Sequence, residues 1–194
     1  MKPSLDDPIQ LAILAERALR GRPHGLYGGL ALAVYGEPRE TRDADVAVLD
    51  CAPDTVTREL GALGIETTVS FNGVPFGGLL ISRVVVYSEA REGLNTLDLV
   101  QPADAEYGRR ALARTVTAPL AGEPVSIVSP EDFVILKLLS TRDRDLEDAA
   151  CVHNRCRDIL DHRLVAAEVT LLDAALPGLG LAAKHARCVV LAGS

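Results

Sequence analysis

Apolar residues recur at helical spacing near the start of the chain. Leu11, Leu14, Ala15 and Ala18 fall on one face of a helical projection, which predicts an amphipathic helix over residues 7–19. The GRPH run that follows ends it. A short strand is expected at residues 25–27, and LALAVY, directly after a glycine pair, predicts a compact helix that Gly36 stops.

The next part of the chain alternates strand-like and helix-like runs. DADVAVLD (43–50) predicts a strand, and APDTVTRELGALG (52–64) predicts a helix closed by Gly64. Three strand-like runs follow at residues 66–71, 79–87 and 96–100. GVPFGG (73–78) predicts a turn between the first two of these runs.

The pattern changes after Pro102. ADAEYGRRALART (103–115) predicts a helix, and residues 115–128 predict short strands around Gly122. SPEDFVILKLLS (129–140) predicts a helix with Ser129 as its N-cap and Pro130 at its first position. Further helices are expected at 144–155, 157–175 and 179–191. The chain therefore divides into an α/β (α+β) domain over residues 1–128 and a helical region over 129–194 that packs on it.

Composition and charge narrow the class of protein. Hydrophobic residues make up 48% of the 194 residues and charged residues 24%, as in soluble globular proteins. The formal net charge of −7 argues against a non-specific nucleic-acid binder, although it leaves room for a local basic patch. The four cysteines form no C-x-x-C pair, and Cys151, His153 and Cys156 do not have a zinc-site spacing. MKPSLDDPIQ carries acids where a secretion signal needs an apolar run, and no apolar stretch reaches the roughly 18 residues that a membrane span requires. We therefore expect a cytoplasmic protein with reduced thiols and no membrane segment.

The first chemical feature is the pair Gly28-Gly29, where a strand turns into a helix. Glycine permits positive φ and lets backbone N–H groups approach a ligand closely. The N-terminus of the following helix favours anions, which suits a triphosphate. For a glycine pair considered alone, a tight turn is the better explanation.

The second feature is the pair Asp43 and Asp45. Residues two apart in a strand face the same side, so the two carboxylates point together. Two like charges about 4 Å apart repel by roughly 4 kcal/mol at an effective dielectric near 20. A divalent cation removes that repulsion, whereas at a solvated strand end the carboxylates would rotate into water instead. A calcium loop does not fit, because Val48 and Asp54 stand where its glycine and glutamate are required.

The spacing between the two features resembles a known family. Thirteen residues separate Gly29 from Asp43, and the run GGLALAVYGEPRETRDADVAV resembles the signature of the DNA polymerase β superfamily nucleotidyltransferases. The R-x-T-x-D-x-D pattern of Arg39, Thr41, Asp43 and Asp45 looks like that of small bacterial members. These include the toxins of type IV toxin–antitoxin systems and the minimal nucleotidyltransferases that pair with helical partner proteins.

The resemblance implies a nucleotidyltransferase fold: a mixed β-sheet flanked by helices, followed by a C-terminal helical region. It also implies an NTP substrate, Mg²⁺ or Mn²⁺ as cofactor, and a third carboxylate on a later strand. Asp98 in NTLDLVQP is the candidate, because it stands among apolar residues in mid-strand. An aspartate on an edge strand or bound to nearby backbone is the alternative. Asp50, Asp54 and Asp104 lie in turn-like contexts and are poorer candidates.

The second half of the chain carries a similar resemblance. SPEDFVILKLLSTRDRDLEDAACV looks like the S-P-E-D-φ-φ-φ-x-K and R-x-x-D segments of the toxin-type enzymes. By that resemblance Lys137 contacts a triphosphate oxygen and Asp145 is a site residue. Without it, Lys137 would extend its ammonium outward to water, and Asp145 and Asp148 would form a solvated helix face paired with Arg142 and Arg144.

These observations predict a metal-dependent nucleotidyltransferase that moves an NMP from an NTP to an acceptor hydroxyl. The expected catalytic and metal-binding residues are Asp43, Asp45 and Asp98. The expected nucleotide-binding residues are Gly28, Gly29, Arg39, Thr41, Lys137 and Asp145. The acceptor is an RNA end such as tRNA, or a partner protein such as a cognate toxin or antitoxin. The alternatives are a non-catalytic binding module with this fold and a small-molecule enzyme of the aminoglycoside type.

Overall fold

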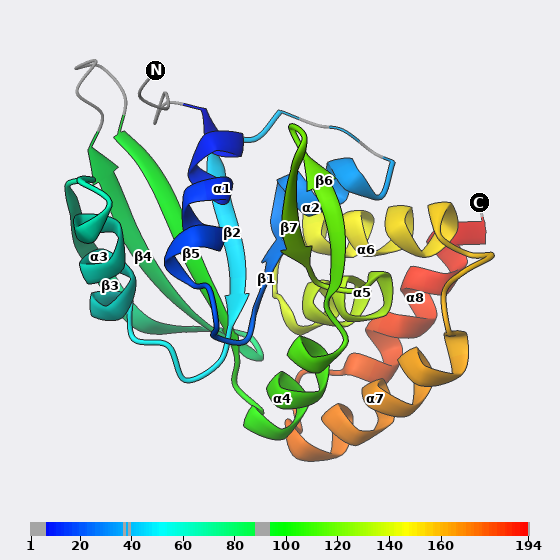
Figure 1. The fold of residues 1–194 in the computed structure, drawn as a ribbon. Coiled ribbons are helices and arrows are strands. Elements are labelled where there is room, and N and C mark those ends of the chain that lie inside the picture. The colour runs from blue at the N-terminus through cyan, green and yellow to red at the C-terminus, as the bar shows by residue number, and fades with distance from the viewer. Residues whose placement is uncertain (1–6, 37, 39, 88–93, 194) are drawn as a thin grey trace.

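The computed structural model describes residues 7–36, 38, 40–87 and 94–193, which form one seven-stranded mixed sheet with eight helices around it (Figure 1). The strand order is β3-β4-β5-β2-β1-β7-β6. The strands are β1 (His24–Tyr27), β2 (Asp43–Val48), β3 (Thr67–Phe76), β4 (Leu79–Tyr87), β5 (Leu94–Pro102), β6 (Val116–Leu120) and β7 (Glu123–Ile127).

The helices are distributed over both halves of the chain. They are α1 (Pro8–Ala18), α2 (Gly28–Val34), α3 (Pro53–Ala62), α4 (Ala105–Ala113), α5 (Pro130–Leu139), α6 (Asp143–Arg155), α7 (His162–Ala175) and α8 (Leu181–Gly193). The α/β class, the mixed sheet and the helical C-terminal region are therefore confirmed. None of the helices in the described part of the chain has the length and apolar character needed to cross a bilayer.

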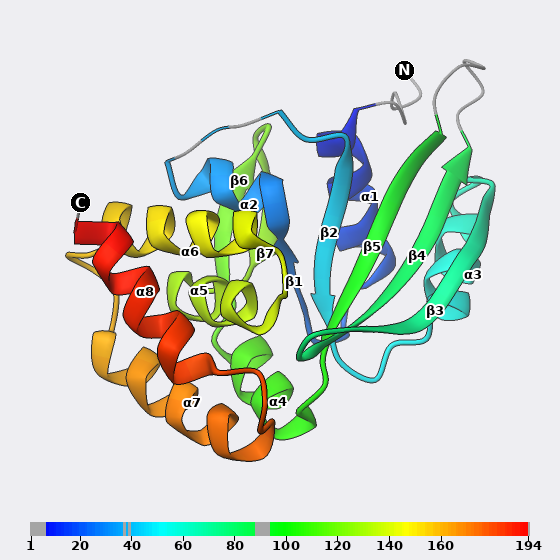
Figure 2. The ribbon, with the colours of Figure 1, turned by 180° about the vertical axis from the view of Figure 1, so that it is seen from behind.

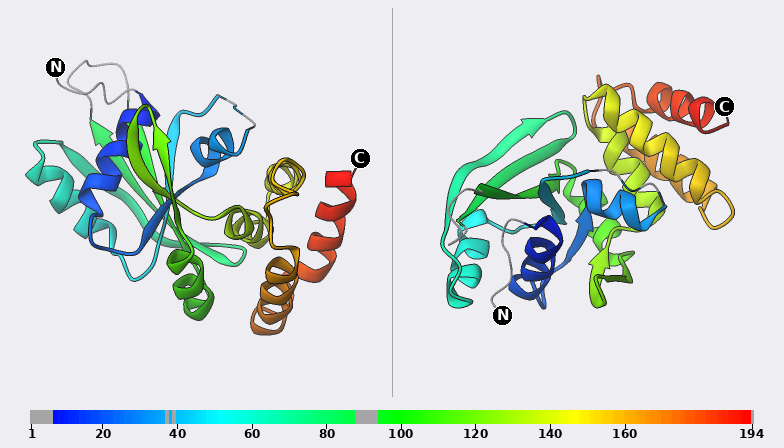
Figure 3. Two further views of the ribbon diagram at one scale, coloured as in Figure 1. Left: turned by 45° about the vertical axis from the view of Figure 1, so that its right-hand side comes forward. Right: turned by 90° about the horizontal axis from the view of Figure 1, so that it is seen from above.

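The centre of the sheet is made by strands distant in sequence. β2 pairs in parallel with β5 and antiparallel with β1, while β1 pairs in parallel with β7. Helices α1 and α3 pack on one face of this sheet, and α5 to α8 gather at one end of the molecule (Figure 3). Figure 2 shows the opposite face of β2, β5, β4 and β3, turned away from α1 and α3. The alternation of side chains along each strand decides which residues reach that face.

Helix α5 anchors the helical region. Ser129 caps it by accepting a hydrogen bond from the backbone N–H of Asp132, as its sequence predicts, and every residue of the helix is buried. Asp132 also accepts hydrogen bonds from Tyr107 and Arg114, which tie α4 and its C-terminal end to α5. The predicted boundary at residue 128 lies between β7 and α5, and remains a prediction.

Two element predictions were wrong in extent. Strand β3 continues through most of the predicted 73–78 turn, because Val74 and Phe76 pair with residues of β4. The chain reverses only at Gly77-Gly78, where a Cβ on Gly77 would lie 2.3 Å from the Leu139 carbonyl oxygen. Helix α7 starts at His162 rather than 157, since Asp161 caps it through its side chain.

Candidate active site

Five directly opposed residues form a row across the sheet. Tyr27 pairs with Asp45, Asp45 with Asp98, Asp98 with Arg83, and Arg83 with Phe71. Directly opposed residues in a sheet present their side chains to the same face. The sheet therefore brings two acids and an arginine together between two aromatic rings, on the face turned away from α1 and α3.

Asp43 joins this row as the residue two positions before Asp45. One carboxylate oxygen from each of Asp43, Asp45 and Asp98 lies within 4.8 Å of the others. Thr41 Oγ1 donates a 2.8 Å hydrogen bond to Asp43 Oδ1, which orients that carboxylate. Burial and the neighbouring charges of Asp43 and Asp98 raise the pKa of Asp45 to about 7. The crowding of the three acids therefore disfavours the charged form of Asp45.

The glycine pair lies against these acids. Gly28 has φ +66°, and a Cβ at this position would lie 1.8 Å from Asp45 Oδ2. A Cβ on Gly29 would lie 2.9 Å from Thr41 Cβ. Both glycines are therefore required by the close approach of the Asp45 and Thr41 side chains, as well as by the turn between β1 and α2.

Arg83 neutralises the third acid. Its Nε and Nη2 donate hydrogen bonds to Oδ1 and Oδ2 of Asp98, both at 2.7 Å. The hydrogen bond to Asp98 raises the pKa of Arg83, which keeps it charged. Asp98, an acid among apolar residues in mid-strand, therefore has a charged partner in Arg83, a residue that no sequence motif indicated.

A second ionic cluster comes from α5 and the start of α6. Lys137 Nζ lies 2.6 Å from Asp145 Oδ1 and 2.8 Å from Asp148 Oδ2, and its side chain is 3% exposed. Asp145 also accepts hydrogen bonds from Ser140 and Arg142. Burial alone would raise the pKa of Asp145, but Lys137, Ser140 and Arg142 outweigh it and lower that pKa. The interpretation of Asp145 and Asp148 as a solvated face was wrong, because Lys137 draws both acids into the interior.

The acids, the glycines and this second cluster line one cavity of about 430 Å³. Its further lining includes the aromatic side chains of Phe71 and Phe76 from β3, with Arg83 stacked over Phe71 and Arg142 over Phe76. One wall of the cavity is thus acidic, and the wall from β3 and β4 is apolar apart from Arg83, with Arg142 reaching Phe76 from the start of α6.

Comparison with known proteins supports the fold. No protein-family model matches this sequence, and no curated protein matches it. Among solved structures, an antigenic nucleotidyltransferase-like protein from Paracoccidioides brasiliensis is similar over 91% of both chains, with 18% identity and a TM-score of 0.50. The antibiotic-resistance factor ANT(2″)-Ia is similar over 87% of this chain and 94% of its own, with 16% identity and a TM-score of 0.53. The chain has the fold of the nucleotidyltransferases.

On this nucleotidyltransferase fold the predicted site residues come together in the cavity. The predicted residues that line it are Gly28, Gly29, Thr41, Asp43, Asp45, Asp98, Lys137 and Asp145. Arg39 lies outside the described residues. The catalytic, metal-binding and nucleotide-binding roles of all these residues remain predictions. No sequence motif indicated Arg83 or the aromatic residues Tyr27, Phe71 and Phe76 as part of the site. The one available signal was Arg83 itself, a lone charge in the apolar strand run LLISRVVVY.

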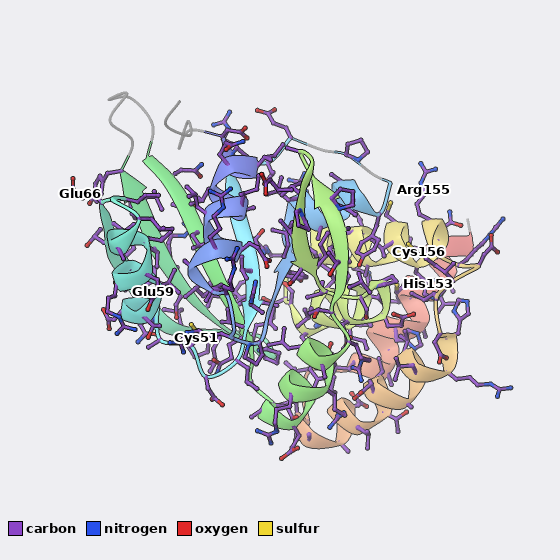
Figure 4. All side chains as sticks on the ribbon, viewed as in Figure 1. Cys51, Glu59, Glu66, His153, Arg155 and Cys156 are labelled. Carbon is purple, nitrogen blue, oxygen red and sulfur yellow. The ribbon has the colours of Figure 1, made fainter. Side chains whose placement is uncertain are left out.

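The donor set fits a divalent cation. Three crowded carboxylates offer the oxygen ligands that Mg²⁺ and Mn²⁺ prefer, and a cation would relieve the repulsion that raises the pKa of Asp45. The cysteines lie elsewhere: Figure 4 places Cys51 below the sheet, whereas Cys156 and His153 lie on the helical side. The nucleotidyltransferase fold therefore carries its candidate metal site on β2 and β5.

Proposed function

We propose that the protein is a metal-dependent nucleotidyltransferase that moves an NMP from an NTP to an acceptor hydroxyl and releases pyrophosphate. The observation that carries this proposal is the meeting of Asp43, Asp45 and Asp98 within 4.8 Å in a cavity whose lining also includes the glycine pair. The nucleotidyltransferase fold supports the same reaction.

In this proposal Asp43 and Asp45 hold Mg²⁺ or Mn²⁺, and Asp98 completes the acidic set. The ion, when bound, neutralises phosphate charge and so favours attack at phosphorus. Backbone N–H groups at Gly28 and Gly29 face the triphosphate, and Thr41 holds Asp43 in orientation. Most of the catalytic effect then comes from positioning and from charge neutralisation.

Lys137 and Asp145 form the proposed far side of the nucleotide site. An ammonium group has three donors, so its contacts with Asp145 and Asp148 leave one for a phosphate oxygen. The proposed role of Asp145 is to hold the side chains of Lys137 and Arg142 in position through its ion pairs with them. Arg39 is proposed to add positive charge at the phosphates.

The proposed reaction breaks one bond and forms one. The acceptor hydroxyl oxygen bonds to the α-phosphorus, and the bond from that phosphorus to the bridging oxygen breaks. The electron pair leaves with pyrophosphate, while the hydroxyl proton passes to a carboxylate oxygen. Asp98 is the proposed base, or a ligand of the ion that activates the hydroxyl.

The charges of the cavity favour an anionic acceptor. Asp98 and Asp145 are already paired with Arg83, Lys137 and Arg142. Arg42 and Arg144 line the cavity as exposed side chains, and Arg42 makes only a loose 3.9 Å contact with the exposed Glu40. An RNA end such as tRNA suits this lining better than a polycationic aminoglycoside, although the net charge suggests the opposite. A partner protein, including a cognate toxin or antitoxin, is the other proposed acceptor.

The test is to incubate the protein with each α-labelled NTP, Mg²⁺ and total cellular RNA or protein lysate. Label on RNA or on one protein, lost in Asp43→Asn, supports the proposal. A thermal-shift measurement with the four NTPs and Mn²⁺ distinguishes an enzyme from a non-catalytic binding module. If no molecule acquires label and no NTP binds in a metal-dependent way, the proposed enzymatic activity is overturned and the binding module is favoured.

A further inference from the structure

The contact between Arg83 and Asp98 sets a limit on how a metal can use the acidic site. Both oxygens of Asp98 receive hydrogen bonds from the guanidinium, and Asp98 is 7% exposed. A two-pronged arginine–carboxylate pair is among the strongest side-chain contacts. A divalent ion that recruits Asp98 must therefore compete with a cation already in place.

The structure also holds Arg83 from its other side. Its Cζ lies 5.5 Å from the centre of the Phe71 ring, a cation–π distance. The ladder between β3 and β4 shifts register on both sides of Phe71, between Val69 and Phe71 and between Phe71 and Val74. Such irregularities re-aim a side chain. Arg83 is thus held between an acid and a ring, and its side chain is 37% exposed.

The other cations near the acids have different partners. Lys137 contacts Asp145 and Asp148, and Arg142 contacts Asp145. Within the described ranges, Arg83 is the basic residue in salt-bridge contact with a member of the acid triad. Among the described residues, Asp98 therefore has a cation as its salt-bridge partner, whereas Asp43 and Asp45 have none. An ion can reach Asp43 and Asp45 without displacing a basic side chain of those residues.

We propose that Arg83 is a positioning residue that competes with the divalent ion for Asp98. The first ion binds Asp43 and Asp45, and Asp98 joins the metal site only as its contact with Arg83 opens. The inference rests on the proposed function, because it takes Asp43 and Asp45 as metal ligands. The inference adds that Arg83 on β4, two strands away from β2 in the sheet, lowers the affinity of the site for the ion.

The inference predicts a rise in metal affinity when the arginine charge is removed. Repulsion between a doubly charged ion and a guanidinium a few ångströms away corresponds to about tenfold in affinity even at the dielectric of water. Arg83→Gln should therefore bind Mn²⁺ about tenfold more tightly. Arg83→Lys retains the charge and should stay near the wild-type affinity.

The experiment is calorimetric titration of Mn²⁺ into the full chain without NTP. The variants are Arg83→Gln and Arg83→Lys, with Arg58→Gln as a charge-matched control on α3. Phe71→Leu keeps all charges but loosens Arg83, and should raise the affinity by less than Arg83→Gln. Thermal unfolding with and without Mn²⁺ provides a second readout, since the variant that binds more tightly should gain the larger shift in Tm.

Tighter binding in Arg83→Gln, with Arg83→Lys and Arg58→Gln near wild type, supports the inference. Equal or weaker binding in a folded Arg83→Gln overturns it while leaving the proposed function intact. If Arg83→Gln does not fold, the result for Phe71→Leu decides. Tighter Mn²⁺ binding in that variant supports the inference, and equal or weaker binding overturns it. Absence of Mn²⁺ binding by the wild-type chain overturns the metal role of Asp43 and Asp45, and the inference with it.

Discussion

The carboxylate of Asp45 lies so close to Gly28 that any side chain at residue 28 would collide with it. A Cβ there would come within 1.8 Å of Asp45 Oδ2 and 2.6 Å of Cγ. The glycine pair and the aspartate pair, separate features in the sequence, are therefore one packed unit. The turn between β1 and α2 can hold its shape only where residue 28 has no Cβ.

Gly28→Ala should consequently move Asp45 and abolish Mn²⁺ binding. Left-handed backbone at alanine costs roughly 1–2 kcal/mol by itself, so stability alone would not identify the cause. Gly64→Ala is the matched control, because Gly64 also has positive φ (+78°) and a Cβ there would meet nothing within 4 Å. We expect both variants to lose stability and Gly28→Ala alone to lose the metal. Retained Mn²⁺ binding in Gly28→Ala would contradict this explanation.

Asp43→Asn should reduce nucleotidyl transfer by at least about a hundredfold, the scale seen when one electrostatic group is removed from a site. The fold should remain, since the change relieves repulsion within the triad and opens no cavity. Labelled transfer measures activity, and circular dichroism with thermal unfolding measures the fold. Thr41→Val, which removes the 2.8 Å hydrogen bond to Asp43, should lose less. Undiminished transfer in Asp43→Asn would remove that residue from the mechanism.

Metal binding should depend on pH through Asp45. Its pKa is raised from 3.8 to about 7, so a proton competes with the divalent ion as pH falls below 7. We expect Mn²⁺ affinity to fall several-fold between pH 8 and pH 6. Titration calorimetry at both values tests this, and a flat profile would contradict it.

The stability of the metal-free protein should show the opposite dependence on pH. Between pH 4 and 7 the folded state binds more protons at Asp45 than the unfolded state, so the free energy of unfolding rises as pH falls through that range. Above pH 7 the charged carboxylate is destabilising, and Asp45→Asn should stabilise the metal-free protein by about 1–2 kcal/mol at pH 8. Urea unfolding at pH 8 and pH 4 should show this gain at pH 8 and its loss at pH 4.

Asp132→Ala should destabilise the junction between α4 and α5. Asp132 is fully buried and accepts hydrogen bonds from Tyr107, Ser129 and Arg114. Removing it leaves Arg114 with Glu168 as its remaining acidic partner and leaves the buried Tyr107 hydroxyl without its acceptor, which costs about 1–3 kcal/mol. The exposed Glu106 is the control, and Glu106→Gln should change the free energy of unfolding by less than about 0.5 kcal/mol. Denaturant unfolding measures both.

Several features of the site could be predicted from short-range pattern. Asp43 and Asp45 share a face because strand alternation has a period of two, whatever the strand pairs with. The cap at Ser129 and the helix that follows it depend on three or four neighbouring residues. The nearness of Asp98 to Asp45 came from the family resemblance, and the structure explains it by the parallel pairing of β2 with β5.

By itself, then, the sequence determined the local elements and the direction in which their side chains alternate. Tertiary structure alone decided that Arg83 meets Asp98, that Phe71 meets Arg83, and that Lys137 draws Asp145 and Asp148 inside. The physical reason is that periodicity is a property of neighbouring residues. Strand register and the pairing of buried charges are instead decided by the joint burial of elements far apart in the chain.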